Sequence, residues 1–104
     1  MNENKVSVLA KCKAKSGMEE ELKKELMALV VLTRAESGCI NYDLHQSVED
    51  KALFILYENW VSKKDLDEHL AMPYLKAFLD KADEILAEPA DITVLEMISE
   101  KAEK

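Results

Sequence analysis

The amino-acid sequence predicts one α+β domain, in which two helices cover one face of a four-stranded antiparallel sheet. Short segments with apolar residues at every second position alternate with two longer segments whose apolar residues recur at every third or fourth position. Their order, β-α-β-β-α-β, is that of a ferredoxin-like domain. We expect residues 1–104 to form this single domain, with a core from about residue 5 to 98 and a charged tail over 99–104.

The first half of the chain predicts a strand, a helix and a second strand. Residues 6–13 combine β-branched residues with polar alternation, which is typical of a strand. Ser16 and Glu19 have the Ser-x-x-Glu spacing of a capping box, so we expect the first helix to begin there. Gly38 provides a stop signal beyond the helix, and the alternation over 40–45 predicts the second strand.

A polar turn over residues 47–51 predicts a hairpin into a third strand over 52–61. Both faces of this strand are apolar, because Ile55 and Tyr57 alternate with Phe54 and its neighbours. Helices on one side of the sheet would leave the other side bare, and a bare apolar face calls for a partner. The sequence therefore predicts a homodimer formed through the open sheet face.

The second half predicts a broken helix and a last strand. Ser62 and Asp65 have the spacing of a helix start, and an apolar stripe follows them. Pro73 lies within that stripe, so we expect a kink or a break near Met72. Residues 92–98 are rich in β-branched and aliphatic side chains and predict the fourth strand.

Composition excludes several classes of function. The formal net charge of −7 over 104 residues argues against nucleic acid and anionic membranes as partners. No apolar run reaches membrane-spanning length, and we expect a cytoplasmic protein. Cys12 and Cys39 are too few for a disulfide framework or a closed zinc site. Only Gly17 and Gly38 are present, so no glycine-rich loop indicates a nucleotide.

Three residues near the third strand form the candidate site. Alternation places Glu58 and Trp60 on one strand face with Phe54 and Leu56. A carboxylate on an apolar face is costly unless it has a partner or a task. His69 lies on the inward stripe of the following helix and can exchange protons near neutral pH. We therefore expect the three side chains to meet across one cavity.

Each of these residues also has a structural interpretation. His69 could bond a strand carbonyl and lock its helix to the sheet, and Glu58 could be a buried acceptor for backbone amides or for His69. Trp60 packs in the core under either interpretation. We expect Asn59 to point to the opposite sheet face and His45 to lie at the surface.

Several motifs recur in order along about residues 5–98. They are Gly17, Glu36-x-Gly38-Cys39-Ile40-x-Tyr42, Tyr57-Glu58-x-Trp60, and His69 followed by Tyr74 and Phe78. With these motifs the sequence resembles the antibiotic biosynthesis monooxygenase family, whose relatives include quinol monooxygenases of the dimeric α+β barrel superfamily. The resemblance implies a dimer whose two sheets close into a barrel, with a cavity between each sheet and its helices.

The resemblance also implies a chemistry. Family members include oxygenases that use neither flavin nor metal and that oxidise electron-rich aromatic substrates, such as hydroquinones, with O₂. His69 would then accept the proton, Trp60 would form the wall or donate a hydrogen bond, and Glu58 would orient or charge the histidine. Further candidate contacts to a small-molecule substrate are Tyr42, Tyr57, Tyr74 and Phe78.

Residues that depart from the family pattern argue against particular reactions and cofactors. Haem-degrading relatives have an asparagine on the first strand near the position of Ala10, so haem degradation is not expected. Asp65 and His69 lack a third ligand, and we expect neither a metal nor another cofactor.

Two alternatives to a monooxygenase remain. One is acid/base isomerisation of a small signalling metabolite on the same scaffold, and the other is a non-enzymatic dimeric binding or stress protein.

Overall fold

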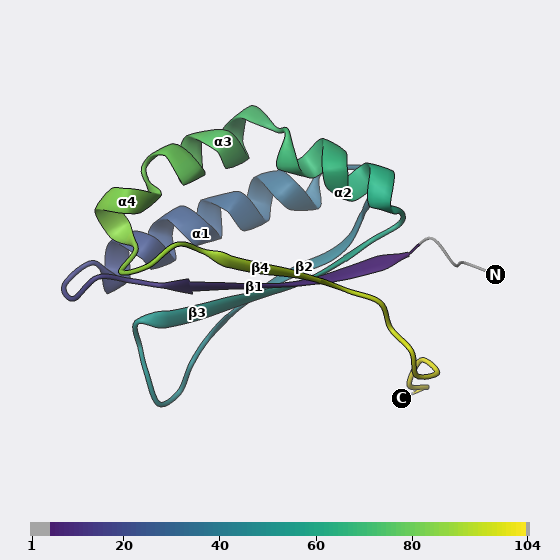
Figure 1. The fold of residues 1–104 in the computed structure, drawn as a ribbon, viewed down its shortest axis with the longest axis horizontal. Helices are drawn as coiled ribbons and strands as arrows, with labels where there is room; N and C mark the ends of the chain where they lie inside the picture. The colour runs from purple at the N-terminus through teal and green to yellow at the C-terminus, as the bar shows by residue number, and fades with distance from the viewer. Residues whose placement is uncertain (1–4, 104) are drawn as a thin grey trace.

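The computed structural model describes residues 5–103 and contains a four-stranded antiparallel sheet in the order β2-β3-β1-β4. All the helices lie on one side of this sheet, and the predicted α+β fold class is confirmed (Figure 1). The ends of the predicted domain, residues 1–4 and 104, lie outside the described part. The elements are β1 (Val6–Lys13), α1 (Glu19–Arg34), β2 (Cys39–Gln46), β3 (Leu53–Trp60), α2 (Lys63–Leu70), α3 (Pro73–Asp80), α4 (Ala82–Ile85) and β4 (Asp91–Leu95).

The core forms between the helices and the inner face of β1 and β3. Ala10 pairs with Leu56 and Cys12 pairs with Phe54 across the two central strands, and all four side chains are buried. The residues between them point to the outer face, as strand alternation requires. The same register continues to Val8 opposite Glu58, so the candidate site is an extension of the core.

Helix α1 begins later than its sequence pattern predicts. The residue before it is Met18, which makes no side-chain capping bond, and Glu19 Oε1 instead accepts a hydrogen bond of 3.0 Å from the Gly17 N–H. Gly17 has a φ of +89°, a left-handed conformation that turns the chain between Ser16 and the helix. The predicted capping box is therefore wrong, although the predicted apolar stripe is buried from Leu22 onward.

The second helical region is divided where the sequence predicts a break. Ser62 caps α2, because its Oγ accepts the Asp65 N–H at 3.2 Å and donates to Asp65 Oδ2 at 2.9 Å. Helix α2 ends at Leu70, and α3 begins with Pro73 in its first turn. The proline has no N–H to continue the α2 hydrogen bonds, so the two helices take different directions.

Strand β4 forms an edge that the helices leave uncovered. Ile92 pairs with Ala10 and Val94 pairs with Val8, so both side chains lie on the helix side of the sheet. They are nevertheless 43% and 48% exposed. The strand ends at Leu95, three residues before the predicted end, and the residues after it form no regular element within the described range. No helix in residues 5–103 is long and apolar enough to cross a membrane.

Candidate functional site

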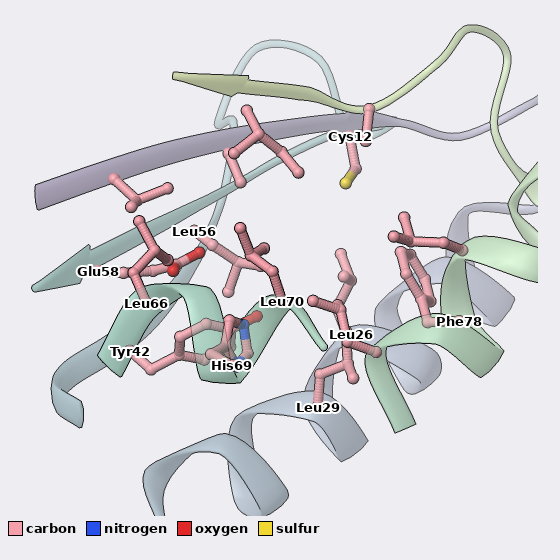
Figure 2. Close-up of a pocket in the computed structure, with 16 residues that line it drawn as sticks. Cys12, Leu26, Leu29, Tyr42, Leu56, Glu58, Leu66, His69, Leu70 and Phe78 are labelled. Atoms are coloured by element: carbon pink, nitrogen blue, oxygen red, sulfur yellow. The ribbon is translucent and has the colours of Figure 1, made fainter. Parts of the chain in front are cut away.

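A cavity of about 40 Å³ lies between the inner face of the sheet and helices α1 to α3. Figure 2 shows Glu58 and His69 with Tyr42 toward one end of this space, and Cys12 and Phe78 toward the other. The lining is otherwise aliphatic, so the cavity has one polar end and one apolar end. The remaining lining residues are Val8, Ala10, Leu26, Leu29, Leu56, Leu66, Leu70, Leu75, Leu79, Ala90 and Ile92.

Glu58 is a buried carboxyl group whose hydrogen-bond partner is its neighbour on the same strand face. Its side chain is almost enclosed, with the residue 4% exposed, and its Oε1 accepts the Trp60 Nε1–H at 3.0 Å. Burial raises the pKa of Glu58 to about 7, the Trp60 hydrogen bond opposes this rise, and the charge of Glu36 adds to it. Glu58 therefore changes its charge close to neutral pH, in contact with the cavity.

His69 lies against two aromatic rings at the end of α2 and is only 2% exposed. The imidazole centroid lies 4.6 Å from that of Trp60, with a tilt of 32°, and 5.6 Å from that of Tyr42, in an edge-on arrangement. Its Nδ1 lies 2.9 Å from Oε2 of Glu36. Within residues 5–103, the other ring nitrogen, Nε2, has no protein hydrogen-bond partner. Nε2 is thus the nitrogen that remains available to a ligand.

The predicted pairing of Glu58 with His69 is wrong. Glu58 bonds Trp60 because side chains two positions apart on a strand share one face. His69 bonds Glu36, which lies in the loop between α1 and β2 and reaches the last turn of α2. A strand carbonyl is not the partner of His69 either. Glu58 and His69 still line one cavity, but each has its own hydrogen-bond partner. Trp60 contacts the His69 ring but does not line the cavity, so the prediction that all three side chains meet across it is wrong for Trp60.

The predicted aromatic contacts divide into two sets. Tyr42 and Phe78 line the cavity. Tyr74 does not line it and instead donates a hydrogen bond to Glu36 Oε2. Tyr57 pairs with Leu9 on the outer face of the sheet, 36% exposed, because alternation turns it away from the helices. The structure therefore does not bring Tyr57 to this cavity.

The predictions for Asn59 and His45 concern residues outside the cavity and agree with the structure. Asn59 lies on the outer face, where its side chain accepts a hydrogen bond from Ser7 and donates one of 3.0 Å to Asn41. His45 is exposed. In the described part of the chain, no cluster of three His, Cys, Asp or Glu side chains could hold a metal ion.

Both cysteines have the character of packing residues. Burial raises the pKa of Cys12 and of Cys39 to about 11, so both thiols are protonated at neutral pH. Cys12 is buried at the apolar end of the cavity, and Cys39 is half-buried at the start of β2. Neither thiol has the lowered pKa that a nucleophile at neutral pH needs.

Glu36 is the site residue that periodicity does not reveal. It lies beyond the end of α1, outside both the helical stripe and the strand alternation, and 33 positions before His69. The available signal is the family motif Glu36-x-Gly38-Cys39, in which a carboxylate follows a helix end directly. That motif gives no indication of the group with which the carboxylate pairs.

Comparisons with known proteins agree with the fold and the motifs. The chain is 34% identical over 95 residues to "Putative monooxygenase Rv0793" of Mycobacterium tuberculosis, covering 91% of this chain and 93% of that protein. It is 31% identical over 85 residues to "Putative monooxygenase YcnE" of Bacillus subtilis, covering 82% and 90% respectively.

Two solved structures are similar to this chain in fold and in sequence. The structure of Rv0793 superposes with a TM-score of 0.87 at 32% identity, covering 94% of this chain and 99% of that one. That of PA3566 from Pseudomonas aeruginosa superposes with a TM-score of 0.88 at 31% identity, covering 95% and 99%. The family model for antibiotic biosynthesis monooxygenases matches residues 5–81, and the chain therefore belongs to this family.

Proposed function

We propose that this protein is a monooxygenase that oxidises a small electron-rich aromatic substrate, such as a hydroquinone, with O₂ and without flavin or metal. The observation that carries the proposal is the position of His69. Its Nδ1 is engaged by Glu36, and the ring borders an apolar cavity. A base in apolar surroundings suits the removal of a phenolic proton and protects a reactive intermediate from water.

The proposed reaction uses O₂ as both the oxidant and the source of oxygen. Nε2 of His69 takes the phenolic proton, and the phenolate passes one electron to O₂. The substrate radical and superoxide then combine by forming a C–O bond. His69 returns its proton to the terminal peroxide oxygen, which gives a ring hydroperoxide. Loss of water leaves one oxygen atom on the ring, so a hydroquinone and O₂ give a hydroxyquinone and water.

The substrate must enlarge the cavity as it enters. The volume of about 40 Å³ is well below the roughly 150 Å³ of a protein cavity that accepts benzene. Three lining side chains are partly exposed and have room to turn outward: Leu70 at 38%, Leu79 at 41% and Ile92 at 43%. We place the entrance between them, at the uncovered edge beside β4.

Replacing His69 with glutamine should lower turnover about 100-fold or more, because general-base catalysis by a positioned side chain contributes at least that factor. The measurement is O₂ consumption with a panel of hydroquinones, using protein freed of metals with a chelator. His45→Gln is the matched control, because His45 is exposed on the outer side of the sheet. Full turnover by His69→Gln, or a rate that requires added metal or flavin, would contradict the proposal.

The small cavity favours a second candidate, proton transfer on a small signalling metabolite. Glu58 and His69 then act as acid and base from the polar end of the cavity. This reaction neither consumes nor requires O₂. Turnover that is unchanged under anaerobic conditions would support isomerisation, whereas loss of turnover without O₂ would support the monooxygenase.

We also propose that two chains associate through their outer sheet faces. The face carries Leu9, Ile55 and Tyr57, which are half-buried or exposed apolar side chains, and the exposed Lys11 lies opposite Ile55. Beside Leu9 and Tyr57, Ser7 and Asn59 are buried and hydrogen-bonded to each other, so this part of the face exposes little polar surface.

Light scattering should give twice the mass of one chain, and Leu9→Glu should shift the protein toward the monomer, because Leu9 lies between Tyr57 and Thr93 on the outer face and a charge buried there is costly. Val48→Glu is the control, since Val48 is 86% exposed in the turn between β2 and β3. A monomeric mass for the unaltered protein, or an unchanged dimer in Leu9→Glu, would count against this interface.

A further inference from the structure

Two polar side chains meet at a single oxygen atom behind the candidate base. Oε2 of Glu36 lies 2.9 Å from Nδ1 of His69 and also accepts the phenolic O–H of Tyr74. The side chain of His69 is 2% exposed and that of Glu36 is 9% exposed, so water competes little for these bonds. The three groups form a connected chain from α3 through the loop after α1 to α2.

The break between α2 and α3 makes this convergence possible. His69 and Tyr74 are five positions apart, and in one continuous α-helix their side chains would point about 140° away from each other. The chain instead ends α2 at Leu70 and restarts at Pro73. The new direction of α3 brings the Tyr74 hydroxyl to the same carboxylate as the imidazole.

Gly38 brings the carboxylate close to α2. A Cβ atom at this position would lie 2.2 Å from Cγ of Asp65, so the loop packs against the first turn of α2 in a way that only glycine permits. Glu36 precedes Gly38 by two residues, and His69 follows Asp65 by one helical turn. The close packing of Gly38 therefore places Glu36 beside the imidazole.

We propose that Glu36, held by Tyr74, is a positioning residue that keeps the proton of neutral His69 on Nδ1 and leaves Nε2 as the basic nitrogen at the cavity. An oxygen that already accepts a phenolic proton and faces a second ring nitrogen requires that nitrogen to donate. Burial, and then the bond to Glu36, raises the pKa of Tyr74, so the phenol keeps its proton and remains a donor.

The other groups around His69 do not compete for this role. Trp60 and Tyr42 present their rings to the imidazole, and the hydrogen-bonded oxygen of Glu58 is taken by the Trp60 N–H. The tautomer is a property of the protein without substrate. Its catalytic consequence, a correctly aimed Nε2, rests on the proposed function.

The tautomer can be read directly by NMR, because the chain has only two histidines. Spectra that correlate the ring nitrogens with the ring protons, recorded on ¹⁵N-labelled protein at a pH where His69 is neutral, should show the Nδ1–H form. His45→Gln removes the only other histidine signal and identifies that of His69. A wild-type signal from the Nε2–H form, or from a mixture, would overturn the proposal whether or not any variant folds.

Two substitutions test whether Glu36 is the cause. Glu36→Ala should release His69 into a mixture of tautomers, whereas Glu36→Gln should retain the Nδ1–H form because its amide oxygen can accept the same proton. Glu68→Gln is the control, since Glu68 is an exposed carboxylate next to His69 in sequence. Retention of the Nδ1–H form in folded Glu36→Ala would overturn the role of Glu36.

A kinetic measurement then separates positioning from catalysis. Glu36→Ala should lower kcat about tenfold or more with little change in KM, and Glu36→Gln should restore a large part of that loss. An equal loss in both variants would count against positioning. If no quinol is turned over, the proposed function fails while the tautomer result stands, because it needs no substrate.

Discussion

Replacing Glu58 with glutamine should make the protein more stable than the native form at pH 8, by up to about 3 kcal/mol. The pKa of Glu58 is raised from 4.5 to about 7 in the folded state. Each pKa unit corresponds to about 1.4 kcal/mol, so the folded protein loses about 3 kcal/mol when this group must ionise in place.

The direction follows from proton binding. Between pH 4.5 and about 7 the folded state keeps a proton on Glu58 that the unfolded state has released. The free energy of unfolding therefore falls as the pH rises through this window, and it falls no further above the folded pKa. Glutamine does not titrate, and its amide oxygen can still accept the Trp60 N–H, so Glu58→Gln should lack this loss.

Urea unfolding at one fixed protein concentration, repeated from pH 4.5 to 8.5, checks this expectation. The informative quantity is the difference in unfolding free energy between Glu58→Gln and the native chain at each pH. Glu68→Gln removes an exposed carboxylate and should leave the pH dependence unchanged. If Glu58→Gln lost stability with pH as steeply as the native protein, Glu58 would not be the titrating group.

Trp60→Ala should cost about 3–5 kcal/mol of unfolding free energy, as for other large aromatic side chains truncated in a core. Trp60 is 0% exposed and lies against both His69 and Tyr42. Its removal leaves a cavity under the sheet and also leaves Glu58 without its hydrogen-bond donor. Urea unfolding measures this loss of free energy. The signal change on unfolding and the dependence of the unfolding free energy on urea concentration are compared between the variants.

Trp60→Phe separates packing from hydrogen bonding. Phenylalanine fills a large part of the space but has no N–H, so the cost should fall to about 1–3 kcal/mol, the range for a buried acceptor left unpaired. The Trp60 bond lowers the pKa of Glu58, so its loss should move the Glu58 titration to a higher pH. If the titration midpoint of Glu58 is unchanged in Trp60→Phe, the Trp60 hydrogen bond does not lower the pKa of Glu58.

The fold was predictable because it depends on local signals. The alternation in β1, the stripe from Leu22 along α1, the Ser62 cap and the Pro73 break all act over a few residues, and the structure contains each of them. The start of α1 was predicted wrongly because a neighbouring residue redirects the backbone there. Gly17 turned the chain ahead of α1, so a correct capping-box spacing did not produce the capping bond.

The site was predictable only in part, because its pairing depends on distant residues. Alternation correctly put Glu58 and Trp60 on the inner face, and helical spacing put His69 against the Trp60 ring. No periodic pattern connects Glu36 with His69, since one lies in a loop and the other at a helix end. The choice between Glu58 and Glu36 as partner is decided by how closely the loop at Gly38 approaches α2, which is a tertiary property.

The stacking of the only tryptophan against His69 also gives the protein an intrinsic optical reporter. Trp60 is the sole indole of the chain, its N–H is bonded to Glu58, and its ring centroid lies 4.6 Å from that of His69. Indole emission responds to nearby charge and to the polarity of its surroundings. The tryptophan fluorescence of the unlabelled protein should therefore report the ionisation of Glu58, to which the indole N–H is bonded, and the entry of a molecule into the adjacent cavity.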